Sequence, residues 1–232
     1  MRVVACSGFP VPVSRYWKEF TAVEVTETET RLPGAGTVRR WVRESPEGFV
    51  FTFRAPAAFA QAGFQLDEEL GSLLSEVSAL SETLRARAIV FAAGETFKHN
   101  RLTRSAVRRF IGALPDDFPT PVLDFPSWSM TQKLEVTADS RAAVAYDPLK
   151  DTRPKSQPLH YLTLTGPAGH RSRYDDGSID KIFESIASIK RGEFMCVFRN
   201  IDMHANASTL WKRIKTIEPV EKPPKKTSSA SA

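Results

Sequence analysis

Eight short segments rich in Val, Ile, Leu and Phe are spaced along the 232 residues of this chain, and turn residues bound most of them. Each segment has the length of a β-strand, and amphipathic helical patterns lie between most of them. The segments are 2–6, 22–27, 48–54, 88–93, 121–125, 142–147, 159–165 and 193–199. Because strands that alternate with helices form parallel sheets with right-handed crossovers, this pattern restricts the chain to an α/β fold.

Two architectures accommodate the pattern, a closed eight-stranded β/α barrel and an open doubly wound sheet. The number of strands favours a TIM-type (β/α)8 barrel, which takes roughly 200–250 residues. We therefore predict one compact barrel domain with short loops over residues 1–217. The segment 218–232 combines Pro, Lys, Ser and Ala without periodicity, and we predict that it is a disordered tail. Between 125 and 141 there is room for a helix of only about two turns.

Composition excludes several classes of protein. No apolar run reaches 18 residues and the N-terminal segment does not resemble a signal peptide, so we expect a cytoplasmic protein without membrane partners. Cys6 and Cys196 are far apart, the four histidines are scattered, and no organic-cofactor motif occurs. Lys and Arg exceed Asp and Glu by 32 to 27, which favours anionic partners in general without indicating nucleic acid.

Glu24 is an unusual residue for a buried strand. In the segment 22–27, Val23 and Val25 share the face expected to meet helices, so alternation turns Glu24 into the barrel. An interior carboxylate needs a cation or a hydrogen-bond donor. Arg54, on the next strand, is the expected partner. Glu24 is then either a general acid/base or substrate ligand, or one half of a structural ion pair.

Several motifs, taken together and in order, resemble the YecE-like family, also known as domain of unknown function seventy-two. They are ACSGF (5–9), VEVTETETRLP (23–33), WVRESPEGFVFTFRAP (41–56), DFPSW (124–128), YLTLTG (161–166) and FRN…ANA (198–207). The resemblance implies a β/α barrel. The chain departs from the family pattern at several positions near the strand ends: Phe9 replaces a Trp, Asp124-Phe125 replaces a longer polar motif, and Arg199 replaces an Asn. It is therefore similar to a divergent and shortened member with a changed barrel mouth.

The carboxyl ends of the strands supply the candidate site residues, because active sites of β/α barrels lie at that face. Glu24 and Asp124 are the candidate catalytic residues. The candidate substrate-binding residues are Ser7, Arg54, Thr163, Thr165, Arg199 and Asn200. Together with Glu24, the strand-end residues Asp124 and Asp147 are compatible with a divalent metal ion or with two-carboxylate hydrolysis. The alternative is that each aspartate only caps the loop that follows its strand.

The loop after the seventh segment is a candidate anion site. Gly166 and Gly169 allow close backbone approach, and His170 and Arg171 supply positive charge. Barrel enzymes bind phosphate with loops in this position. The alternative is an exposed basic loop without a ligand.

Three functions follow from these residues. The first is a hydrolase or lyase acting on a small anionic or phosphorylated substrate. It predicts polar groups that converge in one pocket at the strand ends, and it fails if Glu24 is fully occluded with no pocket next to it. The second is a barrel that binds such a ligand without catalysis. The third, which we rank lowest, is association with nucleic acid through the basic helices and the C-terminal tail. Arg101, Arg104 and Arg108 share one helix face, but that face lacks interleaved aromatic residues.

Overall fold

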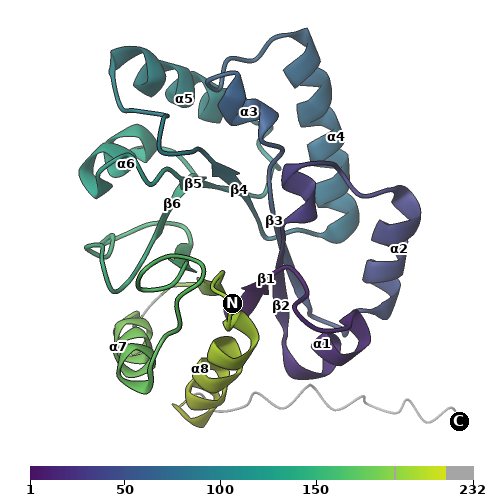
Figure 1. Cartoon of the computed structure of the whole chain (residues 1–232). Helices are drawn as coiled ribbons and strands as arrows, with labels where there is room; N and C mark the ends of the chain where they lie inside the picture. Colours follow the sequence, from purple (N-terminus) through teal and green to yellow (C-terminus); the bar gives the residue numbers. More distant parts are fainter. Residues whose placement is uncertain (191, 218–232) are drawn as a thin grey trace, which may run out of the picture.

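Eight parallel strands close into a barrel in chain order (Figure 1). The first strand, β1, is hydrogen-bonded to both β2 and β8. The computed structural model describes residues 1–190 and 192–217, so the predicted disordered tail lies outside the described residues. The strands are β1 (Arg2–Ser7), β2 (Ala22–Val25), β3 (Val50–Arg54), β4 (Ala88–Ala92), β5 (Thr120–Asp124), β6 (Ala143–Tyr146), β7 (His160–Leu164) and β8 (Phe194–Phe198). The predicted TIM-type barrel is confirmed.

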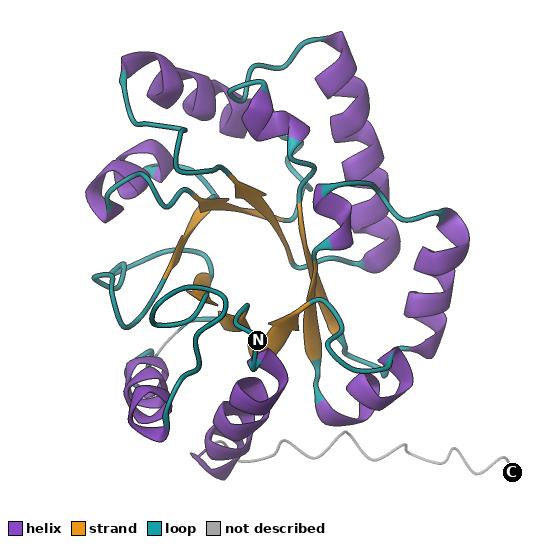
Figure 2. Cartoon of the chain, in the orientation of Figure 1, coloured by secondary structure: helices purple, strands orange, loops and turns teal. Residues whose placement is uncertain are grey.

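Helices form an outer ring around the strands (Figure 2). They are α1 (Val13–Glu19), the 3₁₀ helix η1 (Glu27–Glu29), α2 (Ala35–Glu44), α3 (Ala58–Gln61), α4 (Glu68–Leu84), α5 (Arg101–Ala113), α6 (Met130–Thr137), α7 (Asp176–Ala187) and α8 (Met203–Ile217). The eight residues of α6 agree with the two turns expected there. The connection between β6 and β7, residues 147–159, is a loop in place of a crossover helix.

Four of the helices begin at capping side chains that the sequence supplies. The side chains of Asp67, Asn100, Ser129 and Asp175 each accept a hydrogen bond from a backbone N–H in the first turn of α4, α5, α6 and α7. Two of these caps are reciprocal capping boxes, because the side chains of Thr103 and Gln132 accept a hydrogen bond from the backbone N–H of the cap residue. The caps therefore fix the residue at which each helix begins.

The predicted strand 22–27 is shorter in the structure, because β2 ends at Val25 and η1 follows. The Thr28 hydroxyl donates to the carbonyl oxygens of Val25 (3.2 Å) and Arg54 (2.6 Å), and these bonds turn the chain back over the end of β3. The turn places Glu29 at the rim of the barrel.

Alternation along the strands separates two apolar layers. Side chains such as Val23, Val25 and Phe53 face the helices and join the larger core. The barrel interior holds a second cluster: Val3, Ala5, Ala22, Ala88, Val90, Val122, Ala143, Ala145, Leu159, Tyr161, Met195 and Val197. Barrel interiors usually contain bulky branched residues. Here five of the twelve are alanines, which leaves room for longer polar side chains to cross the barrel.

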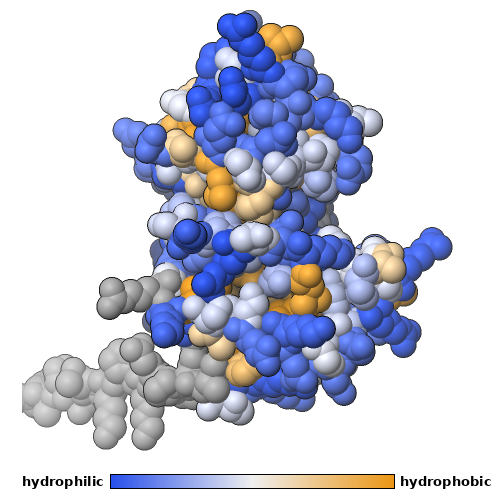
Figure 3. All heavy atoms as spheres, turned by 90° about the vertical axis from the view of Figure 1, so that its left-hand side faces the viewer, coloured by the Kyte–Doolittle hydropathy of each residue, from blue (hydrophilic) through white to orange (hydrophobic). Residues whose placement is uncertain are grey.

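Among the described residues, the large hydrophobic side chains that are exposed are Val42, Leu66, Leu102 and Ile201. Figure 3 shows one face on which apolar side chains gather only in small separate patches. Among the described residues, no helix combines the length and apolar character needed to cross a bilayer.

Candidate functional site

Arg199 directly follows β8 and crosses the barrel to contact residues of β2 and β5. Its Nε and Nη2 donate to the two carboxylate oxygens of Glu24, at 2.9 and 2.6 Å. Its Nη1 donates to Oδ2 of Asp124 at 2.5 Å. The three side chains therefore form one ion cluster at the carboxyl end of the barrel, which we call the mouth cluster.

Glu24 is the buried part of the mouth cluster. Beyond the two bonds from Arg199, Oε1 accepts from the Ser7 hydroxyl at 3.0 Å and Oε2 accepts from the Tyr161 hydroxyl at 2.7 Å. A carboxylate offers about four acceptor positions, and all four are used here. With a side-chain exposure of 0%, Glu24 is occluded and cannot receive a substrate proton in this conformation. Its hydrogen bonds hold Arg199, and Glu24 lines none of the four described cavities, so it does not meet the condition that the enzyme hypothesis set for it.

The predicted pairing of Glu24 with Arg54 is wrong. The Arg54 guanidinium donates through Nη2 to Oε1 of Glu29 at 2.9 Å, at the outer rim of the mouth. The reason lies in η1, which brings a second glutamate to the end of β3, while Arg199 reaches Glu24 from the end of β8, past β1. Arg54 Nε is buried without a hydrogen-bond partner among the described residues.

Tyr161 is a site residue that our sequence interpretation missed. It lies inside the barrel on β7, and its hydroxyl contacts Thr52 of β3 at 3.2 Å as well as Glu24. Two-residue alternation places Tyr161 on the same face as Thr163, so the signal was present in the sequence. Burial and the nearby Glu24 charge raise the Tyr161 pKa, which keeps the hydroxyl protonated as a donor.

Asp124 is the open part of the mouth cluster. Its side chain is 19% exposed, and only Oδ2 has a hydrogen bond in the part of the chain that the structure describes. Burial raises the pKa of both Asp124 and Glu24, but the charge of Arg199 and its hydrogen bonds outweigh burial and lower both pKa values. Both carboxylates are therefore ionised at neutral pH.

These lowered pKa values predict acid lability. The stability that the ionised carboxylates of Glu24 and Asp124 add to the fold is fully present above their ordinary pKa values of 4.5 and 3.8. It is lost as the pH falls through the lower pKa values of the folded state. We expect urea unfolding to show a free energy that is flat above about pH 5 and falls steeply below about pH 4. The fall should be shallower in Glu24→Gln and unchanged in Glu76→Gln, an exposed control. Equal acid slopes in all three proteins would contradict this account.

Thr163, Thr165 and Asn200, the three other predicted ligand residues, are not members of the mouth cluster. Thr163 faces the barrel interior and Thr165 is exposed, and within the described chain neither hydroxyl has a hydrogen bond to the cluster. Asn200 is fully buried and donates to Ser172 O and Asn206 Oδ1, at 3.2 and 2.9 Å. Asn200 therefore fastens the loop after β7 to α8.

The candidate anion loop is closed on itself. The backbone N–H of Gly166 donates to the Tyr174 hydroxyl, that of Gly169 donates to Gly166 O, and that of Ala168 donates to the Ser172 hydroxyl. His170 Nδ1 contacts the carbonyl oxygen of Arg199 at 2.5 Å. Since these donors are already used, the glycines do not form a cradle for phosphate, and the loop instead braces the chain at Arg199.

The proposed acidic trio of Glu24, Asp124 and Asp147 does not assemble. No group of three or more His, Cys, Asp or Glu side chains that could hold a metal ion is found among the residues described. Asp147 caps its own loop, accepting from Leu149 N at 2.9 Å and lying 3.5 Å from Lys150 Nζ. Burial raises the pKa of Asp147, which is the opposite of the shift at Asp124. The loop-capping alternative therefore describes Asp147.

The fold and the mouth cluster define a closed (β/α)8 barrel with an ion cluster at the carboxyl ends of its strands. The model of the family described as protein of unknown function DUF72 matches residues 12–229, and the chain belongs to this family. The resemblance to the YecE-like family is thus confirmed. No curated protein matches the sequence.

Solved structures agree with this family. A DUF72 family protein from Thermotoga maritima is 17% identical with a TM-score of 0.73, covering 93% of this chain and 99% of that one. One from Enterococcus faecalis is 17% identical with a TM-score of 0.72, covering 94% and 98%. A family 2 AP endonuclease from Brucella melitensis is 12% identical with a TM-score of 0.61, covering 94% and 100%. At these identities the likeness establishes the fold.

Proposed function

We propose that the protein binds a small neutral molecule with neighbouring hydroxyl groups at the mouth of the barrel, through Asp124 and Arg199. The observation that carries this proposal is the position of Arg199 between two ionised carboxylates. It differs from the anionic ligand predicted from sequence.

The hydrogen-bonding groups of the mouth fit a pair of hydroxyls. Asp124 Oδ1 is an open acceptor, as described above. A guanidinium carries five N–H donors, and three of those on Arg199 are used within the cluster. One hydroxyl donating to Asp124 and a neighbouring oxygen accepting from Arg199 would satisfy both sides.

The charges of the mouth disfavour an anion. Glu24 and Asp124 both pair with Arg199, Arg54 pairs with Glu29, and the charge of Lys133 acts on Asp124, so these cations are matched by carboxylates. An anion that approached Arg199 would therefore meet the Asp124 carboxylate, and like charges at short range repel. A neutral ligand avoids that cost.

A second candidate is a hydrolase or lyase in which Asp124, rather than Glu24, is the base. The supporting observation is that Asp124 is ionised and partly exposed beside a cationic donor. Measured turnover of a neutral substrate that Asp124→Asn abolishes would favour this candidate over binding alone. Association with nucleic acid gains no support, since Arg104 and Arg108 both contact Glu135.

The Asp124→Asn variant tests the proposal because it should change the affinities for a neutral and an anionic ligand in opposite directions. The probes are propane-1,2-diol and its carboxylate counterpart lactate, with dissociation constants measured by NMR titration. We expect the wild type to prefer the diol, and Asp124→Asn to weaken diol binding about tenfold, the typical loss for one hydrogen bond to a charged group. The same variant should strengthen lactate binding, because it removes the repelling charge.

Asp117→Asn is the matched control, because Asp117 is exposed on the loop that enters β5 at the end opposite Asp124. It should change neither affinity. A wild type that prefers lactate, or an Asp124→Asn variant that binds the diol as tightly as the wild type, would overturn the proposal.

A further inference from the structure

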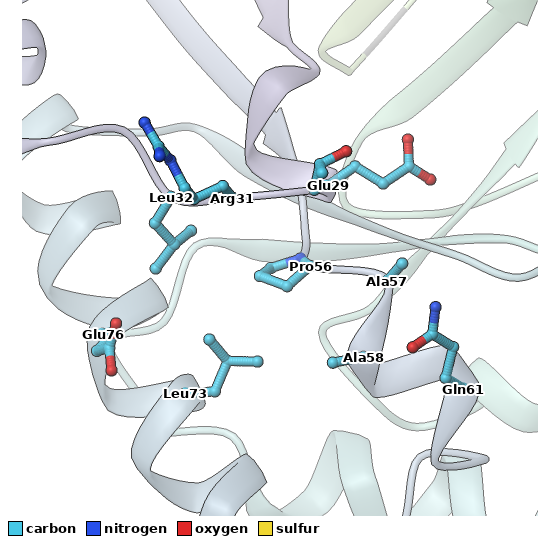
Figure 4. Close-up of a pocket in the computed structure, with 10 residues that line it drawn as sticks. Glu29, Arg31, Leu32, Pro56, Ala57, Ala58, Gln61, Leu73 and Glu76 are labelled. Carbon is cyan, nitrogen blue, oxygen red and sulfur yellow. The ribbon is translucent and has the colours of Figure 1, made fainter.

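A cavity of about 690 Å³ lies beside the barrel mouth, between the loops that follow β2 and β3 and the first half of α4. Its wall is apolar where Leu32, Pro56 and Leu73 face one another, and Glu76 and Gln61 lie at opposite sides (Figure 4). We call it the rim pocket. Its volume is within the range of small-molecule sites, which is about 300–1,000 Å³.

The rim pocket adjoins the mouth cluster through one ion pair. Glu29 lines the pocket, and its carboxylate accepts from Arg54, which ends β3 beside Glu24 on β2. The two loops are also joined directly, because Ala57 N donates to Glu29 O at 2.9 Å. The charge of Arg54 acts on both Glu24 and Asp124, lowering their pKa values. Arg54 therefore lies between the pocket and the cluster.

Arg54 also has an unused donor at this boundary. Its Nε is buried, and no acceptor is found for it among the described residues, although its side chain as a whole is 17% exposed. Buried donors are nearly always paired with protein, water or a ligand. An oxygen on a ligand that extends from the mouth toward the pocket would supply this missing acceptor once Arg54 shifts to expose the N–H.

The position of the rim pocket distinguishes it from the other described cavities. Three cavities are lined by the ends of helices and the loops that enter the strands: residues 108–116 with 136–141, residues 75–86 with 115–119, and residues 42–51 with 83–85. All three lie at the amino-terminal end of the barrel. Of these four cavities, the rim pocket is the one on the side of the mouth cluster.

We propose that the rim pocket and the mouth cluster form one two-part binding site, in which the pocket takes an apolar substituent of a ligand whose hydroxylated head contacts Asp124 and Arg199. This inference rests on the proposed function and names its ligand class: a neutral diol or polyol that carries an aromatic or branched aliphatic group. The apolar group packs against Leu32, Pro56 and Leu73. Removing that group from water adds affinity that the head alone lacks.

The test compares 1-phenyl-1,2-ethanediol with propane-1,2-diol, which share the same diol. We expect the wild type to bind the phenyl compound at least about tenfold more tightly, from the apolar area it buries. Ala58→Phe, which fills the pocket, should remove this preference without changing the affinity for propane-1,2-diol. Leu73→Gln, a variant of similar size that makes the wall polar, should reduce the preference too. Ala113→Phe, at an exposed position at the end of α5, is the control and should keep it.

The outcomes separate this inference from the proposed function. Equal affinities of the two diols for the wild type, or a phenyl preference that survives both Ala58→Phe and Leu73→Gln, would overturn the inference while leaving the mouth proposal intact. In another outcome the phenyl preference depends on the pocket, but Asp124→Asn changes the affinity for neither diol. That outcome would overturn the proposed function, and with it the single two-part site. The two proposals are supported together if Asp124→Asn loses affinity for both diols and Ala58→Phe loses only the preference for the phenyl compound.

Discussion

Replacing Arg199 with methionine should lower the free energy of unfolding by about 3–5 kcal/mol, the usual cost of removing one partner from a buried ion pair. The substitution leaves the Glu24 carboxylate ionised, with a side-chain exposure of 0% and only two of its four donors. Asp124 loses its partner as well, but its 19% exposure lets water compensate. Urea unfolding at pH 7 measures the effect.

A double variant shows whether the loss comes from the stranded charge. Combining Arg199→Met with Glu24→Gln removes the charge together with its partner, so we expect it to recover about 2–3 kcal/mol relative to Arg199→Met alone. Arg173→Met, which removes a 73% exposed arginine from a surface ion pair with Asp202, should be nearly neutral. Additive losses in the double variant would show that Arg199 stabilises the barrel by packing rather than by charge.

Gly166→Ala should lower the free energy of unfolding by about 2–4 kcal/mol, combining backbone strain with a steric collision. Gly166 has φ +99°, and a Cβ atom there would collide with the carbonyl oxygen of Gly169 and with Ser172 Oγ. Ser172 Oγ is the acceptor for Ala168 N, so the collision opens the loop at its own closing bond.

Gly169→Ala is the matched control for this loop. Gly169 also has a positive φ, +93°, but a Cβ atom there meets nothing within 4 Å. We therefore expect only the backbone part of the cost, about 1 kcal/mol. Urea unfolding of both variants gives the comparison, and equal losses would mean that the collision at Gly166 is relieved without cost.

The barrel was predictable because it depends on local signals repeated along the chain. Strand alternation placed Val23 and Val25 toward the helices and Glu24 inward, and the structure has the same arrangement. What alternation cannot give is the partner of an inward side chain. Adjacent strands suggested Arg54, whereas a side chain as long as Arg199 crosses the barrel and contacts residues on strands that are not its neighbours.

The hydrogen bonds that close the loop after β7 could not be predicted from the sequence for a related reason. Gly166, Gly169, His170 and Arg171 are residues typical of anion loops, and their types alone do not show whether backbone N–H groups are free. The deciding contacts come from Tyr174 and Ser172 inside the loop and from the carbonyl of Arg199 across it. Such contacts depend on tertiary structure, which the local sequence does not specify.

Departures from the family pattern were more informative than matches. Asp124 and Arg199 both differ from the pattern that the chain resembles, and the structure joins them at 2.5 Å. Two segments in which the chain departs from that pattern therefore meet in one ion pair at the barrel mouth. The catalytic or binding role of either residue stays a prediction.

Closure of the barrel between β1 and β8 also sets an order for folding. Glu24 belongs to the second strand, whereas its arginine follows the eighth, 175 residues later. Contacts of such sequence separation form late, because the loop-closure entropy must be overcome first. Until β8 docks, Glu24 lacks its arginine and depends on water for hydrogen bonds. Docking of the last strand therefore closes the ring and supplies the partner of Glu24 in the same step.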